Sequence, residues 1–176
     1  MLIDSTYFRN EIKLNIGTYS DIDQYITRYE KEVLTALLGY DLYKAFLAGL
    51  EDPSPLQKWL DLRDGVEYTQ GDRTVKWNGL INSDKISLIA YYVYCKYLLT
   101  KQSVPAQAGV VQPVNENSTL VDGAVGYVQA WNAFVDLYGY SGQDVYEASA
   151  LNYLSVHESD YDYHNKDFEK TNILGI

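Results

Sequence analysis

Hydrophobic positions recur at helical spacing along the first half of the chain. Apolar side chains stand every three to four positions from Ile22 to Leu37, after Ser20 and Asp21, which suit a helix N-cap. This spacing predicts a helix that ends at Gly39, a favourable C-terminal residue. A second helix is expected over 42–50, ended by Asp52-Pro53. A third should begin at Ser54-Pro55 and run through Trp59 to Asp64.

Two short segments alternate between apolar and polar residues, as half-buried strands do. Ile12, Leu14 and Ile16 alternate with Lys13 and Asn15, which predicts a short strand. Farther along, residues 66–69 and 73–77 flank Gln70, Gly71 and Asp72, a pattern that predicts a hairpin over 66–77 with a three-residue loop. Two paired strands are marginally stable alone, so this hairpin should rest on the helices or on a neighbouring subunit.

The second half of the chain contains the most apolar helical pattern. Residues 84–100 are apolar on nearly all sides, which predicts a central helix surrounded by others and capped by Asn82 or Ser83. Two further helices are expected, one from Val121 to Tyr138 and one over 143–155. Between the central helix and the fifth, residues 102–118 contain Pro105 and Pro113 and are expected to form a long loop.

These elements predict a mainly α protein. We expect a compact bundle of five to six helices over residues 1–156, with the hairpin 66–77 and the loop 102–118 as additions. Residues 157–176 are acidic with an apolar end and should form an extended C-terminal tail. A chain of 176 residues fits one domain and can bury about two thirds of the surface that its unfolded form exposes.

Composition and charge limit the kinds of function that we expect of this chain. The formal net charge is −10, and the 14 basic residues are scattered, so specific binding to DNA or RNA is not expected. An acidic surface would instead repel DNA that passes along it. The chain has 18 tyrosines, whose rings suit partly wet contacts; any single one is best read as core edge, but together they favour an assembling protein.

We expect neither a secretory signal nor a membrane span. The first residues lack the basic and apolar regions of a secretory signal, and the stretch from Ile86 to Leu99 is shorter than the roughly 20 residues of a membrane span. We therefore expect a soluble protein without a membrane partner. The single cysteine, Cys95, excludes an intramolecular disulfide and suits a reducing cytoplasm.

No pattern of catalytic or ligand-binding residues stands out. His157, Asp160, Asp162 and His164 are metal-ligand residue types, but their segment lacks helical periodicity and reads better as a solvated acidic tail. Cys95 lies in an apolar helix that should raise its pKa and suppress its reactivity. Phosphate-binding glycine loops and serine nucleophile motifs do not occur. We therefore expect no enzyme activity, no cofactor and no metal.

Several short stretches, taken in order, nevertheless resemble a known family. They are Tyr25-Ile26, Leu37-Leu38-Gly39 with Tyr43 and Phe46, Trp59, Gly65, Trp77-Asn78-Gly79-Leu80, Tyr91-Tyr92-Val93-Tyr94 and Asn172-Ile173-Leu174-Gly175-Ile176. Their order and the length of the chain resemble the small helical head-tail connector, or adaptor, proteins of tailed bacteriophages, which form a ring beneath the portal.

This resemblance implies a structural role in the virion. It implies a ring of about twelve identical subunits with heterologous contacts, made in the host cytoplasm and placed in the neck of the virion. The ring would bind the portal protein on one side and a downstream neck or tail protein on the other. It would extend or seal the DNA channel after genome packaging, with DNA passing through and not bound specifically. The alternative is a soluble helical protein-binding module, monomeric or dimeric, without a virion role.

Two sets of residues are candidates for the contacts of such a ring. The apolar end of the tail, with Phe168, Ile173, Leu174 and Ile176, is expected to dock on the portal. The hairpin tip (Gln70, Gly71 and Asp72) and the long loop around Val110 and Val111 are expected to contact neighbouring subunits or the tail-side partner.

Overall fold

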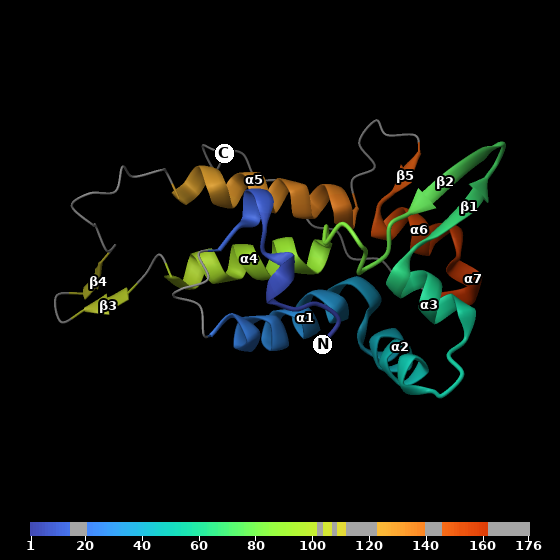
Figure 1. Cartoon of the computed structure of the whole chain (residues 1–176), viewed down its shortest axis with the longest axis horizontal. Coiled ribbons are helices and arrows are strands. Elements are labelled where there is room, and N and C mark those ends of the chain that lie inside the picture. Colours follow the sequence, from blue (N-terminus) through green and yellow to red (C-terminus); the bar gives the residue numbers. More distant parts are fainter. Residues whose placement is uncertain (15–20, 102–103, 107–108, 112–122, 140–145, 162–176) are drawn as a thin grey trace.

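Three helices placed side by side form the body of the protein, with the most apolar one in the middle. In the computed structural model, α4 (Leu88–Lys101) lies between α1 (Ile22–Leu38) and α5 (Gly123–Tyr138), as Figure 1 shows. The structure describes residues 1–14, 21–101, 104–106, 109–111, 123–139 and 146–161. Most α4 side chains are buried, among them Ile89, Val93 and Cys95, because neighbours cover this helix on both flanks. The prediction of a central, surrounded helix is confirmed.

Smaller elements gather at the two ends of this body. At one end lie α2 (Tyr40–Glu51), α3 (Gln57–Asp64), β1 (Val66–Gln70), β2 (Arg73–Trp77), β5 (Glu147–Ala148), α6 (Ala150–Val156) and α7 (Glu158–Tyr161). At the other end lie β3 (Val104–Ala106) and β4 (Gly109–Val111), beyond the last turn of α4 (Figure 1). The described residues thus form a mainly α fold with a small β component, as the sequence predicts.

The described strands form two separate sheets. Strand β2 is central in a three-stranded sheet, antiparallel to β1 and parallel to β5. Strands β3 and β4 pair only with each other, antiparallel, with Val104 opposite Val111. The predicted loop over 102–118 therefore contains a second hairpin, and residues 102–103, 107–108 and 112–118 of that loop lie outside the described residues. The β1–β2 loop has two residues and not three, since Gln70 pairs with Arg73.

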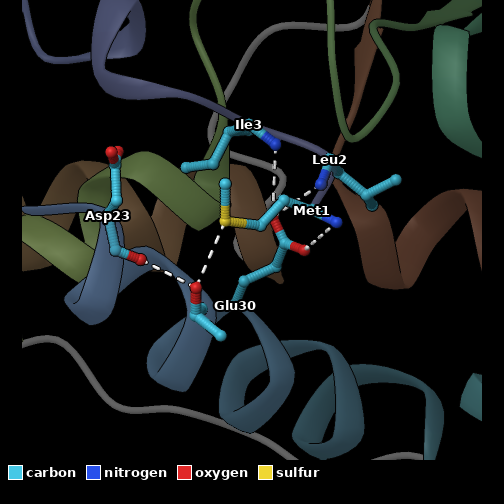
Figure 2. Close-up of polar contacts among 6 residues, drawn as sticks. Met1, Leu2, Ile3, Asp23 and Glu30 are labelled. Carbon is cyan, nitrogen blue, oxygen red and sulfur yellow. Dashed lines mark hydrogen bonds and ion pairs between the residues drawn. The ribbon is translucent and has the colours of Figure 1, made fainter.

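The N-terminal segment lies across the helical body and is fixed by one buried carboxylate. Glu30, on α1, is 8% exposed, and its Oε2 accepts hydrogen bonds from the Leu2 and Ile3 N–H groups at 2.8 and 3.2 Å. The Met1 amine lies 3.8 Å from Glu30 Oε1 (Figure 2). Farther along, Ile3, Tyr7, Phe8, Ile12 and Leu14 enter the core. The segment is therefore part of the core and not a loose arm.

The strand predicted near Ile12 is wrong. Residues 10–12 form a short 3-10 helix, preceded by a similar turn over 5–7, and residues 15–16 of the predicted strand lie outside the described part of the chain. The alternation was nevertheless informative about burial: Ile12 and Leu14 are buried while Lys13 is exposed. Within the described residues this segment packs on helices and has no strand to pair with. The alternation of apolar and polar residues therefore reflects alternating burial and not the hydrogen bonds of a sheet.

Several predicted helix starts lie too early. Helix α4 begins at Leu88, not at 84, because Ser87 serves as the cap: its Oγ accepts from the Ile89 N–H, and its carbonyl oxygen accepts from the Tyr91 N–H. Asn82, predicted as a cap, instead bonds the backbone of Ile86. Helix α3 begins at Gln57 and not at Pro55, and α6 begins at Ala150 and not at 143, because residues 147–148 pair with β2.

The C-terminal region also differs from expectation. Where an extended tail should begin at 157, residues Glu158–Tyr161 form the short helix α7, and Tyr161 is 3% exposed. Its hydroxyl donates to the Lys58 carbonyl oxygen at 2.7 Å, and its ring lies 5.9 Å from that of Trp59. Residues 162–176, which hold the rest of the predicted tail, lie outside the described residues. The folded region therefore extends at least to Tyr161.

Most of the described tyrosines belong to the interior. Seven of them are buried and six more are partly buried against the core, and only Tyr40 and Tyr146 are exposed among the tyrosines that the structure describes. Several pack in aromatic groups along α4 and α5. The ring centroids of Tyr92 and Phe134 lie 5.2 Å apart, and those of Phe134 and Tyr138 lie 5.5 Å apart. The high tyrosine content thus builds the core of one chain, and it does not by itself indicate a surface for assembly.

Candidate interaction surfaces

The hairpin β1–β2 carries the first predicted contact residues at its tip. Gln70, Gly71 and Asp72 are all exposed, and a β-carbon at Gly71 would meet no atom within 4 Å. Gly71 has a φ of +63°, which glycine adopts without the steric cost that other residues bear. The structure therefore places the three predicted residues together at an open turn, as the sequence suggests.

Aromatic packing holds this hairpin in place. Trp77 on β2 stacks on Tyr153 of α6, with ring centroids 5.5 Å apart, and its Nε1 donates to the Leu62 carbonyl oxygen at 3.2 Å. Tyr68 on β1 donates through its hydroxyl to Asn152 Oδ1 at 3.0 Å. The predicted support for the hairpin thus comes from helices of the same chain, and these contacts fix the position of the strands that carry the tip.

The hairpin β3–β4 carries the second predicted contact residues, Val110 and Val111. The two strands occupy the end of the body opposite to β1–β2 (Figure 1). They pair with no third strand in the part of the chain that the structure describes. The sequence analysis named these two valines but did not predict that they would lie in a strand. The two predicted contact regions are therefore not one site, since they lie at opposite ends of the molecule.

An open polar pocket lies beside the base of the hairpin β1–β2. Its volume is about 310 Å³, and its walls come from the start of β1, the end of β2 and the turn at residues 82–84. The residues that line it are Asp64, Gly65, Val66, Glu67, Lys76, Trp77, Asn78, Asn82, Ser83 and Asp84. Three carboxylates face a single lysine, so the pocket would favour a cationic group over an anion. Sequence reasoning did not find this pocket, because its residues come from two strands and a separate turn.

His157, which the sequence analysis assigns to a solvated acidic segment and not to a metal site, lies in a group of aromatic side chains. His157 donates through Nδ1–H to the Tyr153 carbonyl oxygen at 2.9 Å, and its ring packs edge-on against that of Tyr68, with centroids 5.0 Å apart. Among the described residues no group of three or more His, Cys, Asp or Glu side chains could hold a metal ion. Asp160, the second candidate in that cluster, is exposed, and Asp162 and His164 lie outside the described residues. His157 is therefore a packing residue of the aromatic group beneath the hairpin.

Cys95 is buried at 1% exposure in the centre of α4, and burial raises the pKa of its thiol to about 12. The thiolate that nucleophilic chemistry requires is thus a minor species at neutral pH. The expectation that burial would raise this pKa is confirmed. The structure gives Cys95 the surroundings of a core residue and not those of an activated nucleophile.

Two phenol–carboxylate pairs join the central helix to its neighbours. The Tyr92 hydroxyl donates to Glu32 Oε1 at 2.6 Å, and Lys96 Nζ lies 2.9 Å from the same oxygen. Burial and the adjacent carboxylate raise the pKa of Tyr92. Burial alone would raise the pKa of Glu32, but the hydrogen bonds from Tyr92 and Lys96 outweigh it, so that pKa lies below its usual value. Tyr91 donates in the same way to Glu11 of the N-terminal segment.

The predicted portal-docking residues, Phe168, Ile173, Leu174 and Ile176, lie outside the described residues.

No single described helix is long and apolar enough to cross a membrane. Helices α1 and α2 reach the required length and apolar composition only as a pair, and the chain bends by 115° between them. Comparison with protein-family models, with curated proteins and with solved structures gives no match.

Proposed function

We propose that this chain is a structural virion protein that forms a ring beneath the portal of a tailed bacteriophage. The ring connects the head to the tail and extends or seals the DNA channel. The proposal rests on the resemblance of the sequence landmarks to head-tail connector proteins. The structural observation that best supports it is the position of the two hairpins, β1–β2 and β3–β4, at opposite ends of an elongated helical body (Figure 1).

Opposite ends matter because a ring needs heterologous contacts. In such a ring each subunit uses one surface toward the neighbour on one side and a different surface toward the neighbour on the other. The exposed tip at Gln70–Asp72 and the strand that contains Val110 and Val111 are two such surfaces on one molecule. A protein that used a single pocket for a small ligand would not need either projection.

The charge of the chain fits a channel that DNA crosses. With a formal net charge of −10, a ring of about twelve copies would carry a strongly negative charge, which disfavours adhesion of the DNA backbone. The partners in this proposal are other copies of the chain, the portal protein and a downstream neck or tail protein. DNA passes through the ring without specific binding.

Quantitative peptide mass spectrometry of purified virions tests the proposal directly. Copies of this chain are counted relative to the portal protein of the same particles. A ratio near one places the chain in a neck ring of matching symmetry. Absence from virions that contain portal protein overturns the proposal and leaves a soluble helical binding module, monomeric or dimeric, as the function to pursue.

Two variants test the predicted contacts separately. Deletion of residues 168–176, which removes Phe168, Ile173, Leu174 and Ile176, should abolish binding to purified portal protein while circular dichroism shows that the protein remains folded. Replacement of Val110 and Val111 by alanine should weaken assembly and leave portal binding of the monomer intact. Unchanged portal binding after the deletion, or unchanged assembly of the double variant, would remove that segment from the contacts.

A further inference from the structure

Among the residues that the structure describes, the hairpin β3–β4 has one blocked edge and one open edge. Pro105, in the middle of β3, lies opposite Val110 of β4. Proline has no N–H, so Pro105 and Val110 cannot form a pair that exchanges two hydrogen bonds. They must form the other type of antiparallel pair, in which the backbone N–H and C=O groups of both residues point away from the partner strand. The outer edge of β3 therefore lacks its central donor, whereas the outer edge of β4 presents the N–H and C=O of Val110.

The hairpin β1–β2 also has an open edge, which lies on β1. The Lys76 N–H donates to the Tyr146 carbonyl oxygen at 2.8 Å, on the side of β2 that faces away from β1. Lys76 pairs with Glu67, so the backbone groups of Glu67 must point away from β2 as well, and those of Thr69 follow by the two-residue period. No strand covers this side of β1 in the described part of the chain.

These two edges are the longest open ones in the described sheets. Strand β1 offers five residues and β4 three, while β5 contributes only two residues to the opposite edge of the larger sheet. Short strands and proline are the usual means by which proteins protect sheet edges, and here they protect β5 and β3. Neither β1 nor β4 contains a proline, and β1 is the longest strand at either edge of the larger sheet.

Charge selects a second copy of the chain as the occupant. The net charge of −10 makes copies repel one another over most of their surface, yet no charged residue occurs between Lys101 and Glu116, the segment that contains both strands of the smaller hairpin. Charged side chains, lysine above all, commonly prevent edge pairing, and β3 and β4 contain none. An uncharged strand can approach an acidic neighbour without an electrostatic penalty.

We propose that β4 of one copy adds to the outer edge of β1 of the next copy, so that each contact extends the larger sheet by the smaller hairpin. Because the two edges lie at opposite ends of the molecule (Figure 1), the contact is head-to-tail and generates a closed ring or an open chain of subunits. This inference rests on the proposed ring and adds the hydrogen-bonding groups through which neighbours join: Val110 on one side, and Glu67 and Thr69 on the other.

Proline substitutions test the contact selectively. Val110→Pro and Thr69→Pro each remove an outward N–H while leaving the hydrogen bonds within their own hairpin in place, since neither N–H points at its partner strand. Val110→Ala and Thr69→Ala are the matched controls, because they shorten the side chain and keep the N–H. Self-association of the full chain is measured by sedimentation velocity over a concentration series, with circular dichroism as the check on folding.

We expect each proline variant to weaken self-association by about tenfold or more relative to the alanine variant at the same position, because alanine removes only side-chain contacts and keeps the N–H. Wild-type association that both proline variants retain would overturn the strand addition and leave the ring intact as a proposal. Loss of association in Val110→Pro but not in Thr69→Pro would overturn the choice of β1. A wild-type chain that stays monomeric at every concentration would also overturn the inference, while the copy number in virions decides the ring proposal separately.

Disulfide trapping provides a second measurement that does not depend on proline. Val110→Cys is mixed with Thr69→Cys or with Glu67→Cys and oxidised; facing residues in a sheet lie within the reach of a disulfide. Cys95 is buried, so the introduced thiols are the accessible ones. We expect a mixed disulfide with one of the two β1 variants. A disulfide that forms only between two Val110→Cys chains would show that β4 pairs with β4, and would overturn the proposal.

Discussion

Gly79 packs so closely on Gly65 that a β-carbon at position 79 would lie 2.6 Å from the Gly65 nitrogen. The same β-carbon would lie 2.5 Å from the carbonyl carbon of Asp64, so both neighbours are backbone and cannot move aside. Here the end of α3 crosses the end of β2, and hydrogen bonds from the Leu80 and Ile81 N–H groups to residues 62 and 63 close the crossing. The hairpin and the turn at 82–84 depend on this contact for their position.

Gly79→Ala should therefore destabilise the protein by about 3 kcal/mol or more, because the φ of +84° and the backbone clash act together. Gly71→Ala is the matched control: its φ is also positive, but its surroundings are open, so we expect a cost of about 1 kcal/mol. Urea unfolding monitored by circular dichroism measures both. Equal costs would contradict the backbone crossing.

Replacing Glu30 by alanine should release the start of the chain from α1. The Leu2 and Ile3 N–H groups would lose their buried acceptor, and we expect a loss of about 1–3 kcal/mol in the free energy of unfolding. Hydrogen exchange of residues 2–3 should increase in the native protein. Glu51→Ala, on the exposed end of α2, is the control that should leave both measurements unchanged.

Tyr161→Phe should remove the hydrogen bond to the Lys58 carbonyl oxygen and leave the ring in contact with Trp59. The expected cost is about 1 kcal/mol, whereas Tyr161→Ala should cost about 3–5 kcal/mol because it also empties a buried ring position. Thermal unfolding gives the order of the two variants. Tyr146→Ala, at an exposed ring, should have little effect, and an equally small effect at Tyr161 would show that α7 does not contribute to stability.

Stability should fall in acid partly through Glu32. Its pKa is lower in the folded chain than its ordinary value of 4.5, so its ionised form stabilises the fold above that value. The contribution disappears as the pH falls from about 4.5 through the folded pKa, when the carboxylate is protonated. Wild type should thus exceed Glu32→Gln in stability at pH 7, and the gap should close at pH values well below 4.5. A gap that is constant with pH would contradict this assignment.

Thiol reagents should leave Cys95 unmodified in the native protein, because its side chain is buried and burial raises its pKa to about 12. Intact-mass spectrometry after treatment with iodoacetamide should show modification only in denaturant. Asp72→Cys provides the accessible control on the hairpin tip. Rapid native modification of Cys95 would mean that α4 and α5 separate readily.

The sequence predicted those elements whose signals are local. The end of α1 at Gly39 and the strands on either side of Gly71 are as expected, because glycine at a positive φ and apolar periodicity act within a few residues. The start of α4 was misplaced because Asn82 binds the backbone of Ile86 and delays the helix until Ser87 can cap it. Such competition between nearby polar groups is not visible in periodicity.

Contacts between distant residues account for the remaining differences. Helix α7 is too short to be stable alone; its Tyr161 is held by Lys58, which lies 103 positions earlier. For the candidate surfaces, the exposed tip at Gly71 was predictable from turn chemistry, and Val110 and Val111 were named from composition alone. Their strand and its open edge could not be predicted, because the effect of Pro105 depends on which residue it faces.

The dependence of α3 on α7 also bears on the order of events during synthesis. Trp59 is covered by a residue that follows it by about a hundred positions, and Lys58 Nζ likewise binds the Asp160 carbonyl oxygen. During synthesis on the ribosome, α3 therefore cannot complete its packing against α7 until residue 161 has emerged from the exit tunnel. A chain that ended before Tyr161 would leave the ring of Trp59 without this cover.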